Sequence, residues 1–158
     1  MSRPPADDLV IRKLSDDEPI PFDLLLLADP DKKMIENYLS DSLVFVAEID
    51  TQQIGVFVLY KIDDEKIEIK NIAVKTEYQK QGFGTTMLNY AFTYSKDEGF
   101  EMMIISTANS SIQQLKLYQR FGFEITEIKK NFFIDNYSEP IYENGTQAKD
   151  LIVHSLRL

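Results

Sequence analysis

The pattern of apolar and polar residues divides the chain into strands and helices. Runs of alternating or β-branched residues predict strands at residues 9–14, 43–49, 54–62, 66–74, 102–106, 123–129 and 151–158. Apolar residues at helical spacing predict helices at residues 21–27, 32–39, 85–98 and 111–121. The polar residues 50–53 predict a hairpin turn between the second and third strands. This order is typical of a mixed sheet with helices on both faces, so we expect one α/β (α+β) domain over residues 1–158.

The predicted helices have recognisable ends. Gly99 and Gly122 follow the last two helices, at the position where glycine commonly closes a helix. Ser110 and Ser111 each have a glutamine three residues later, which predicts a capping box at the start of the fourth helix. The segment 29–31, Asp-Pro-Asp, provides a break and a cap between the first two helices.

The segment with the clearest chemistry is residues 77–88, Glu-Tyr-Gln-Lys-Gln-Gly-Phe-Gly-Thr-Thr-Met-Leu, which joins a strand to a helix N-terminus. Such a turn directs unpaired backbone N–H groups and the positive end of a helix dipole at one point, which suits a phosphate. Gly82 and Gly84 would let the backbone approach a ligand where a Cβ would obstruct it. A Rossmann fingerprint fits poorly because Met87 stands where a third small residue is required, and no Gly-Lys-Ser/Thr P-loop occurs.

Composition and charge exclude several kinds of site and partner. The chain has no cysteine and one histidine, which excludes thiol nucleophiles, disulfides, thiolate metal sites and multi-histidine metal sites. Lys and Arg number 17 against 26 Asp and Glu. The resulting acidity argues against nucleic acid and anionic membranes as partners and mildly favours cationic acceptors, although surplus acid also serves solubility. The amino end has no apolar signal core, so we expect a soluble cytoplasmic protein.

Two motifs resemble the GNAT superfamily of N-acyltransferases. Residues 79–84, Gln-x-x-Gly-x-Gly after a strand, are similar to the acyl-CoA-binding loop of that family. Residues 117–123, Leu-Tyr-x-x-x-Gly-Phe, are similar to the end of its next helix. The resemblance covers about residues 43–125. It implies a central, mostly antiparallel sheet with helices on both faces, in which the strand at 66–74 splays from the next one and binds acyl-CoA in the gap.

The resemblance also implies an activity, which is acetyl transfer from acetyl-CoA to a primary amine of a small molecule or peptide by direct attack, without a metal. Tyr118 would protonate the departing CoA thiolate, although its apolar neighbours at helical spacing also suit a core tyrosine. Glu68 would act as the general base. In several family members the base at this position acts through water. The neighbouring Lys66 and Lys70 equally suit an exposed charge ladder on that strand.

The resemblance places the acetyl-CoA site on three segments. Backbone N–H groups of Ile72, Ala73 and Val74 would bind the pantetheine and polarise the thioester carbonyl. Asn109, or Ser111 in its place, would contact the pantetheine, and a turn or cap role is the alternative for Asn109. The loop residues expected to bind the cofactor, together with Tyr118, are Gln79, Lys80, Gln81, Gly82, Phe83, Gly84 and Thr85.

Two features fall outside the motifs. His154 lies on the apolar face of the last strand and is expected to be half-buried with its polar atoms satisfied. Residues 131–145 are rich in aromatic and acidic side chains, which suits an acceptor pocket wall, a homodimer contact or packing under a long loop. Two other functions remain open, namely a non-catalytic CoA-sensing or protein-interaction module of the same fold, and a dinucleotide-binding βαβ unit.

Overall fold

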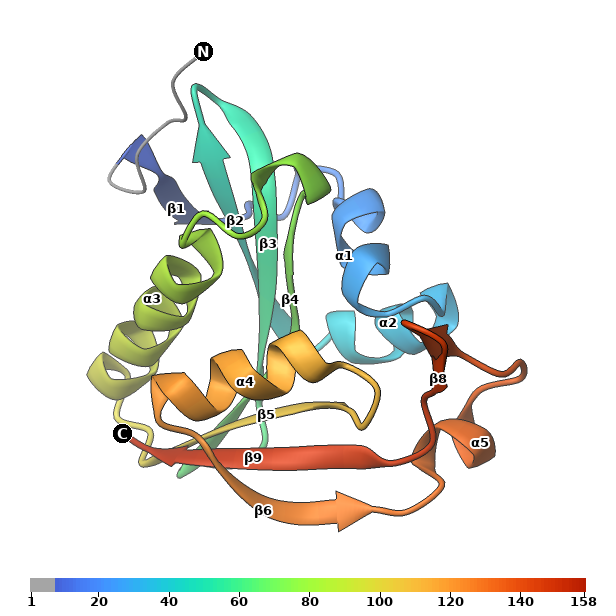
Figure 1. Ribbon diagram of the computed structural model, residues 1–158. Coiled ribbons are helices and arrows are strands. Elements are labelled where there is room, and N and C mark those ends of the chain that lie inside the picture. Colours follow the sequence, from blue (N-terminus) through green and yellow to red (C-terminus); the bar gives the residue numbers. More distant parts are fainter. Residues whose placement is uncertain (1–7) are drawn as a thin grey trace.

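A seven-stranded sheet forms the centre of the protein. The computed structural model describes residues 8–158 (Figure 1). Neighbouring strands are antiparallel except for β4 and β5, which are parallel. In their order across the sheet, the strands are β1 (Val10–Lys13), β2 (Ser42–Ile49), β3 (Gln52–Lys61), β4 (Lys66–Val74), β5 (Met102–Ala108), β9 (Leu151–Arg157) and β6 (Glu124–Lys129). The predicted class, a mixed and mostly antiparallel sheet, is confirmed.

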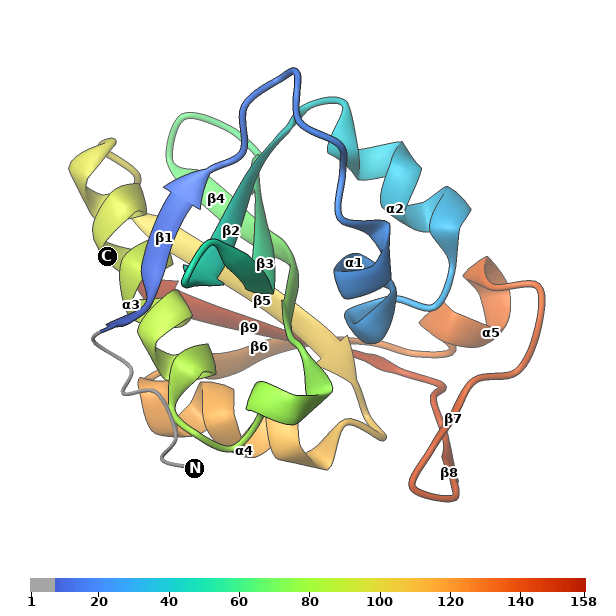
Figure 2. The same ribbon diagram turned by 90° about the horizontal axis from the view of Figure 1, so that it is seen from above.

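Helices cover both faces of this sheet, as the view from above shows (Figure 2). On one face, α1 (Phe22–Ala28) and α2 (Lys32–Leu39) pack on β2, β3 and β4 around the buried Leu25 and Ile35. On the other face, α3 (Phe83–Asp97) and α4 (Ile112–Phe121) bury a larger cluster. Within residues 8–158, no helix is both long and apolar enough to cross a membrane.

A β-bulge in β4 changes which face its side chains occupy. Val58 on β3 pairs with Asn71, whereas the next residue, Leu59, pairs with Ile69, so Lys70 is the extra residue. Ile69 therefore joins the cluster under α3 and α4, while Ala73 joins the cluster under α1 and α2. The sequence pattern of β4 predicted the strand, but simple alternation does not predict this switch.

Several predicted boundaries are confirmed. Asp31 caps α2, because its carboxylate accepts hydrogen bonds from the backbone N–H groups of Lys33 and Met34. Gly99 and Gly122 adopt positive φ angles of 94° and 126° just after α3 and α4.

The capping box predicted for α4 is wrong. Ser111 occupies the cap position, but its side chain makes no hydrogen bond to the first turn of the helix. Its hydroxyl donates instead to Oε1 of Glu143 at 2.8 Å.

The segment 131–145, expected as one long loop, contains regular structure. α5 (Phe132–Asn136) is followed by a hairpin of β7 (Tyr142–Glu143) and β8 (Thr146–Gln147). Its turn residues, Asn144 and Gly145, have φ angles of 51° and 78°, as a two-residue turn between antiparallel strands requires. An Asn-Gly pair is the strongest short-range signal for such a hairpin, so this element could have been predicted.

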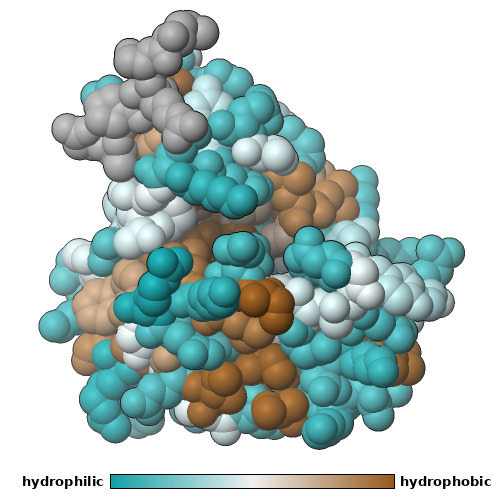
Figure 3. Space-filling view, in the orientation of Figure 1, coloured by the Kyte–Doolittle hydropathy of each residue, from teal (hydrophilic) through white to brown (hydrophobic). Residues whose placement is uncertain are grey.

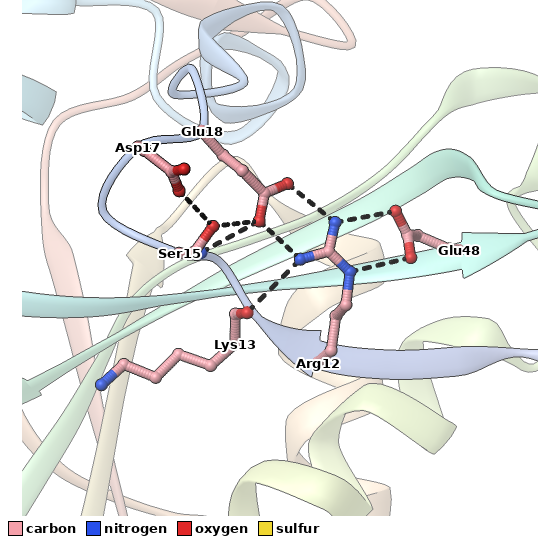
Figure 4. Close-up of polar contacts among 6 residues, drawn as sticks. All are labelled: Arg12, Lys13, Ser15, Asp17, Glu18 and Glu48. Atoms are coloured by element: carbon pink, nitrogen blue, oxygen red, sulfur yellow. Dashed lines mark hydrogen bonds and ion pairs between the residues drawn. The ribbon is translucent and has the colours of Figure 1, made fainter.

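Arg12 links the first strand to its neighbour and to the segment before α1 (Figure 4). Its guanidinium donates two hydrogen bonds to Glu18, at 2.7 and 2.8 Å, and two to Glu48, at 3.0 and 3.2 Å. Hydrogen bonds from Arg12 and from Ser15 hold the pKa of Glu18 well below its usual range. This network ties β1 both to β2 and to the segment that leads into α1.

Candidate active site

The parallel strands β4 and β5 separate part of the way along the sheet. They pair from Lys66 opposite Met102 to Ile69 opposite Ile105. Beyond this point β4 pairs only with β3, while β5 continues to pair with β9 as far as Ala108. Among the described residues, no strand covers the edge of Ile72–Val74 that faces β5. The separation implied by the family resemblance is therefore present, and it begins at the β-bulge.

A cleft of about 530 Å³ opens at this separation. Figure 3 shows the corresponding face, with a recess that has hydrophobic surface inside and hydrophilic residues at its rim. The cleft is lined by Leu27, Ala28, Ile72, Ala73, Val74, Tyr78, Gln79, Lys80, Gly82, Gly84, Thr85, Gln113, Gln114, Leu117, Tyr118, Arg120, Glu143 and Asn144. Nine of these residues were expected at the acetyl-CoA site from the sequence.

The loop between β4 and α3 is held in place by its own side chains. The amide Nε2 of Gln79 donates to the Val74 carbonyl at 2.9 Å, and Nε2 of Gln81 donates to the Glu77 carbonyl at 3.1 Å. Lys80 and Gly82 adopt positive φ angles of 61° and 89°. Gly82 caps α3, and open space surrounds the position of its absent Cβ. The first N–H groups of α3 consequently face a cavity, which is the arrangement that binds phosphates.

Two expected loop residues point elsewhere. The side chain of Phe83 is buried in the core, where its ring centroid lies 6.2 Å from that of Tyr78. Gln81 is used to brace the loop and does not line the cleft. Their part in the site is thus to hold the loop that presents Gly82, Gly84 and Thr85.

Tyr118 belongs both to the core and to the cleft. Its side chain is 4% exposed, packs edge-on against Phe123 and His154, and lines the cleft. Burial raises the pKa of its phenol, so the hydroxyl keeps its proton at neutral pH. The two interpretations of this tyrosine from the sequence are compatible, because a core tyrosine can present its hydroxyl at the cleft wall.

His154 is more deeply buried than expected. Its side chain is fully buried rather than half-buried, with Nδ1 3.2 Å from the Ile152 carbonyl oxygen. Nε2 has no hydrogen-bond partner among residues 8–158, which corrects the expectation of a satisfied histidine. Desolvation lowers the pKa of the imidazole, so it is neutral and packs beside Tyr118.

Glu68 lies outside the cleft lining. On β4 it occupies the face opposite Ile67 and Ile69, and its carboxylate pairs with Nζ of Lys70 at 3.2 Å. Lys70 in turn lies 5.3 Å from the ring centroid of Tyr60. The ion pair with Lys70 is the kind of contact that the charge-ladder interpretation of Glu68 predicts.

The amide of Asn109 serves the fold. Its Oδ1 accepts hydrogen bonds from the backbone N–H groups of Lys149 and Asp150 at 2.8 and 3.0 Å, and its Nδ2 donates to the Gln147 carbonyl at 3.3 Å. Asn109 and Ser111 both lie outside the cleft lining. Of the two interpretations of Asn109, this geometry supports the turn role.

Sequence reasoning offered residues 131–145 as a pocket wall, but it did not place Leu27, Ala28, Glu143 and Asn144 together at one end of the cleft. These residues come from the end of α1 and from the β7–β8 hairpin, two elements far apart along the chain. The Asn-Gly turn signal could have located the hairpin, but no local pattern shows that it reaches α1 and α4.

A second hollow, of about 710 Å³, continues from the cleft between α3 and α4. The two share Thr85, Leu117 and Arg120, and the second is also lined by Arg157 and Asn89. Together they form a long depression with cationic side chains along one part, large enough for an elongated anionic ligand.

Comparison with known proteins agrees with this geometry. The model of the acetyltransferase (GNAT) family matches residues 10–123. An uncharacterized N-acetyltransferase of Bacillus subtilis, YvbK, is 44% identical over 131 residues, covering 83% of this chain and 84% of that protein.

Solved structures show the same fold with a ligand. A GNAT family acetyltransferase from Elizabethkingia anophelis with acetyl-CoA bound is 45% identical, with a TM-score of 0.94 over 96% of this chain and 99% of the other. A Bacillus subtilis acetyltransferase in complex with CoA is 41% identical, with a TM-score of 0.88 over 95% and 99% of the two chains. With a family match over most of its length, a splayed parallel strand pair and a glycine loop at a helix N-terminus, this chain belongs to the GNAT family of acetyltransferases.

Proposed function

We propose that this protein transfers the acetyl group of acetyl-CoA to a primary amine of a small molecule or peptide, by direct attack in a ternary complex. The observation that carries the proposal is the shared cleft, in which the uncovered edge of β4, the N-terminus of α3 and Tyr118 meet. The ligands named for the two related structures, acetyl-CoA and CoA, support the choice of co-substrate.

Each part of acetyl-CoA has a matching surface. The pyrophosphate would bind the N–H groups at the start of α3, next to Gly82 and Lys80. The pantetheine would extend along Ile72–Val74 and accept the backbone hydrogen bonds that no strand uses there. The nucleotide would occupy the hollow between α3 and α4, where Arg120 supplies positive charge.

The chemistry would need a neutral amine and a protonated Tyr118. A neutral amine attacks the thioester carbonyl carbon, and its oxygen becomes an oxyanion that accepts hydrogen bonds from backbone N–H groups of β4. Collapse breaks the carbon–sulfur bond, and the protonated Tyr118 hydroxyl donates its proton to the departing thiolate. The chain has no cysteine, so no acyl-thioester on the enzyme takes part.

The amine must lose a proton during the reaction, and two routes are compatible with the site. One passes through water to Glu68, which lies outside the cleft lining. The other passes directly to solvent. The pH dependence of a Glu68 variant separates the two routes.

The experiment that tests the proposal is release of free thiol from acetyl-CoA in the presence of a panel of amines, polyamines, aminoglycosides and peptide N-termini. Turnover with any member supports the transferase. Tight acetyl-CoA binding with no thiol release for the whole panel would support the alternative, a CoA-sensing or protein-interaction module of the same fold.

A further inference from the structure

Charge is distributed unevenly along the cleft. The cationic side chains that line it, Lys80 and Arg120, lie at the loop before α3 and at the last turn of α4. Among the described residues that line it, Glu143 is the only acidic one. Glu143 lies at the opposite end, beside the N-terminus of α4, and Figure 1 shows the β7–β8 hairpin beyond that end of the helix. One end of the cleft thus suits an anion and the other suits a cation.

The carboxylate of Glu143 is held in a defined position. The buried hydroxyls of Ser110 and Ser111 lie 3.4 and 2.8 Å from its Oε1, and both donate to that oxygen. Oε2 has no hydrogen-bond partner among residues 8–158. One oxygen therefore fixes the side chain, and the other keeps its capacity to accept a hydrogen bond.

The backbone around Glu143 is equally constrained. The two-residue turn at Asn144 and Gly145 sets the register of the hairpin, in which Glu143 pairs with Thr146. Asn109 binds the Gln147 carbonyl at the end of this hairpin. The hairpin is therefore tied to the rest of the fold through both of its strands, and Glu143 on it lines the cleft.

Another carboxylate, Asp29, is likewise anchored through one of its oxygens. Its Oδ1 accepts hydrogen bonds from the Tyr137 hydroxyl and from the Asp31 backbone N–H, each at 3.1 Å. Asp29 does not line the cleft. The cation-binding role at this end therefore falls to Glu143.

We propose that Glu143 binds a positively charged group of the acceptor, so that the substrate class is an amine carrying a second positive charge beyond the reacting nitrogen. This inference rests on the proposed acetyl transfer.

Ser111 and Tyr118 are seven residues apart and thus lie on one face of α4, about 10 Å apart along the helix axis. The Tyr118 side chain leans toward Ser111, because helical side chains point toward the N-terminus. Because Ser111 binds Glu143, we infer that about the length of a short carbon chain separates the Glu143 carboxylate from the Tyr118 hydroxyl.

The test compares two acceptors that differ in one charge. Cadaverine has an ammonium group at each end of a five-carbon chain, whereas pentylamine has one. Thiol release from acetyl-CoA is measured with each amine for the wild type, Glu143→Gln and Glu139→Gln. In Glu143→Gln the amide oxygen of the new side chain can still accept from Ser111, so the hairpin should fold. Glu139 is an exposed acidic residue of the same segment that lies outside the cleft, and it provides the matched control.

We expect the wild type and Glu139→Gln to have a kcat/KM for cadaverine about tenfold to a hundredfold above that for pentylamine. In Glu143→Gln the ratio should fall to near one, mainly through a higher KM for cadaverine. Equal kcat/KM values in the wild type, a ratio retained in Glu143→Gln, or turnover of neither amine despite turnover of other panel members would each overturn the inference. If no member of the panel leads to thiol release, the proposed transferase itself is overturned instead.

Discussion

The hydroxyl of Tyr137 donates a hydrogen bond to Oδ1 of Asp29 at 3.1 Å, joining residues 108 positions apart in the sequence. Asp29 ends α1, and Tyr137 follows α5, so this bond ties the C-terminal segment to the first helices. Desolvation raises the pKa of Asp29 and of Tyr137. Close by, Asn71 donates to the Tyr38 hydroxyl at 3.1 Å, and burial raises the pKa of Tyr38 to about 12. A polar link therefore joins the end of α1, which lines the cleft through Leu27 and Ala28, to the segment that follows α5.

Replacing Tyr137 with Phe should loosen that end of the cleft. The ring still packs against Phe133, but the bond to Asp29 is lost, so we expect a decrease of about 1 kcal/mol in the free energy of unfolding. The acceptor KM should rise while the Kd for acetyl-CoA stays the same. Chemical denaturation, steady-state kinetics and calorimetry measure the three quantities. Tyr142→Phe, at an exposed tyrosine of the same segment, is the control, and equal effects of the two variants would contradict the link.

Acid should weaken the anchoring of the first strand. Glu18 has a pKa held below its unfolded value of about 4.5, because it binds Arg12 and Ser15 in the folded state. A carboxylate with a depressed folded pKa stabilises the fold above the unfolded value, and this contribution is lost as the pH falls below it. We expect Glu18→Gln to lower stability at pH 7 and to flatten its decline below about pH 4.5. Parallel stability curves for variant and wild type through this range would show that the pair is not linked to folding.

Tyr118→Phe should separate chemistry from binding. The phenylalanine ring keeps the contacts with Phe123 and His154, so stability and acetyl-CoA affinity should be preserved. Without the proton donor, kcat should fall by about 10²–10⁴ if protonation of the thiolate limits the rate. Thiol-release kinetics and thermal unfolding measure both effects. A large loss of stability with turnover intact would assign the tyrosine to the core alone.

Glu68→Gln tests the route of the amine proton. If Glu68 accepts the proton through water, the variant should lose the ascending limb of the pH–rate profile that belongs to this base, and regain activity as rising pH deprotonates the amine unaided. Kinetics across pH, at saturating acetyl-CoA, measure this. An unchanged profile would leave the carboxylate in the ion pair with Lys70 and assign the proton to solvent.

Local patterns in the sequence were enough to predict most of the fold and half of the cleft. Each strand of the main sheet and the four longer helices follow from periodicity, and the loop at residues 79–84 follows from its glycines and its place between a strand and a helix. These features depend on neighbouring residues only. For this reason a single sequence, without structural information, predicts them correctly.

The remaining features depend on contacts between distant segments. The bulge at Lys70 arises from the register of β4 against β3, which no residue type in β4 signals. Ser111 gave a capping signal, but a carboxylate from residue 143 competes successfully for its hydroxyl. The burial of His154 likewise depends on distant segments, namely α4, whose Tyr118 packs against it, and β5, which pairs beside it in the sheet. The residues at one end of the cleft, Leu27, Ala28, Glu143 and Asn144, come together only in the folded chain.

The most direct test of the account is calorimetric titration of acetyl-CoA into the wild type, Gly82→Asp and Gly99→Asp. Both glycines have positive φ angles, 89° and 94°, and open space at the Cβ position, so the two substitutions strain the backbone alike. Of these two glycines, Gly82 alone lines the cleft, where an aspartate would add a charge beside the pyrophosphate. We predict that Gly99→Asp binds acetyl-CoA as the wild type does, whereas Gly82→Asp binds at least about a hundredfold more weakly. Equal affinity of Gly82→Asp and the wild type would contradict the assignment of this loop to the co-substrate.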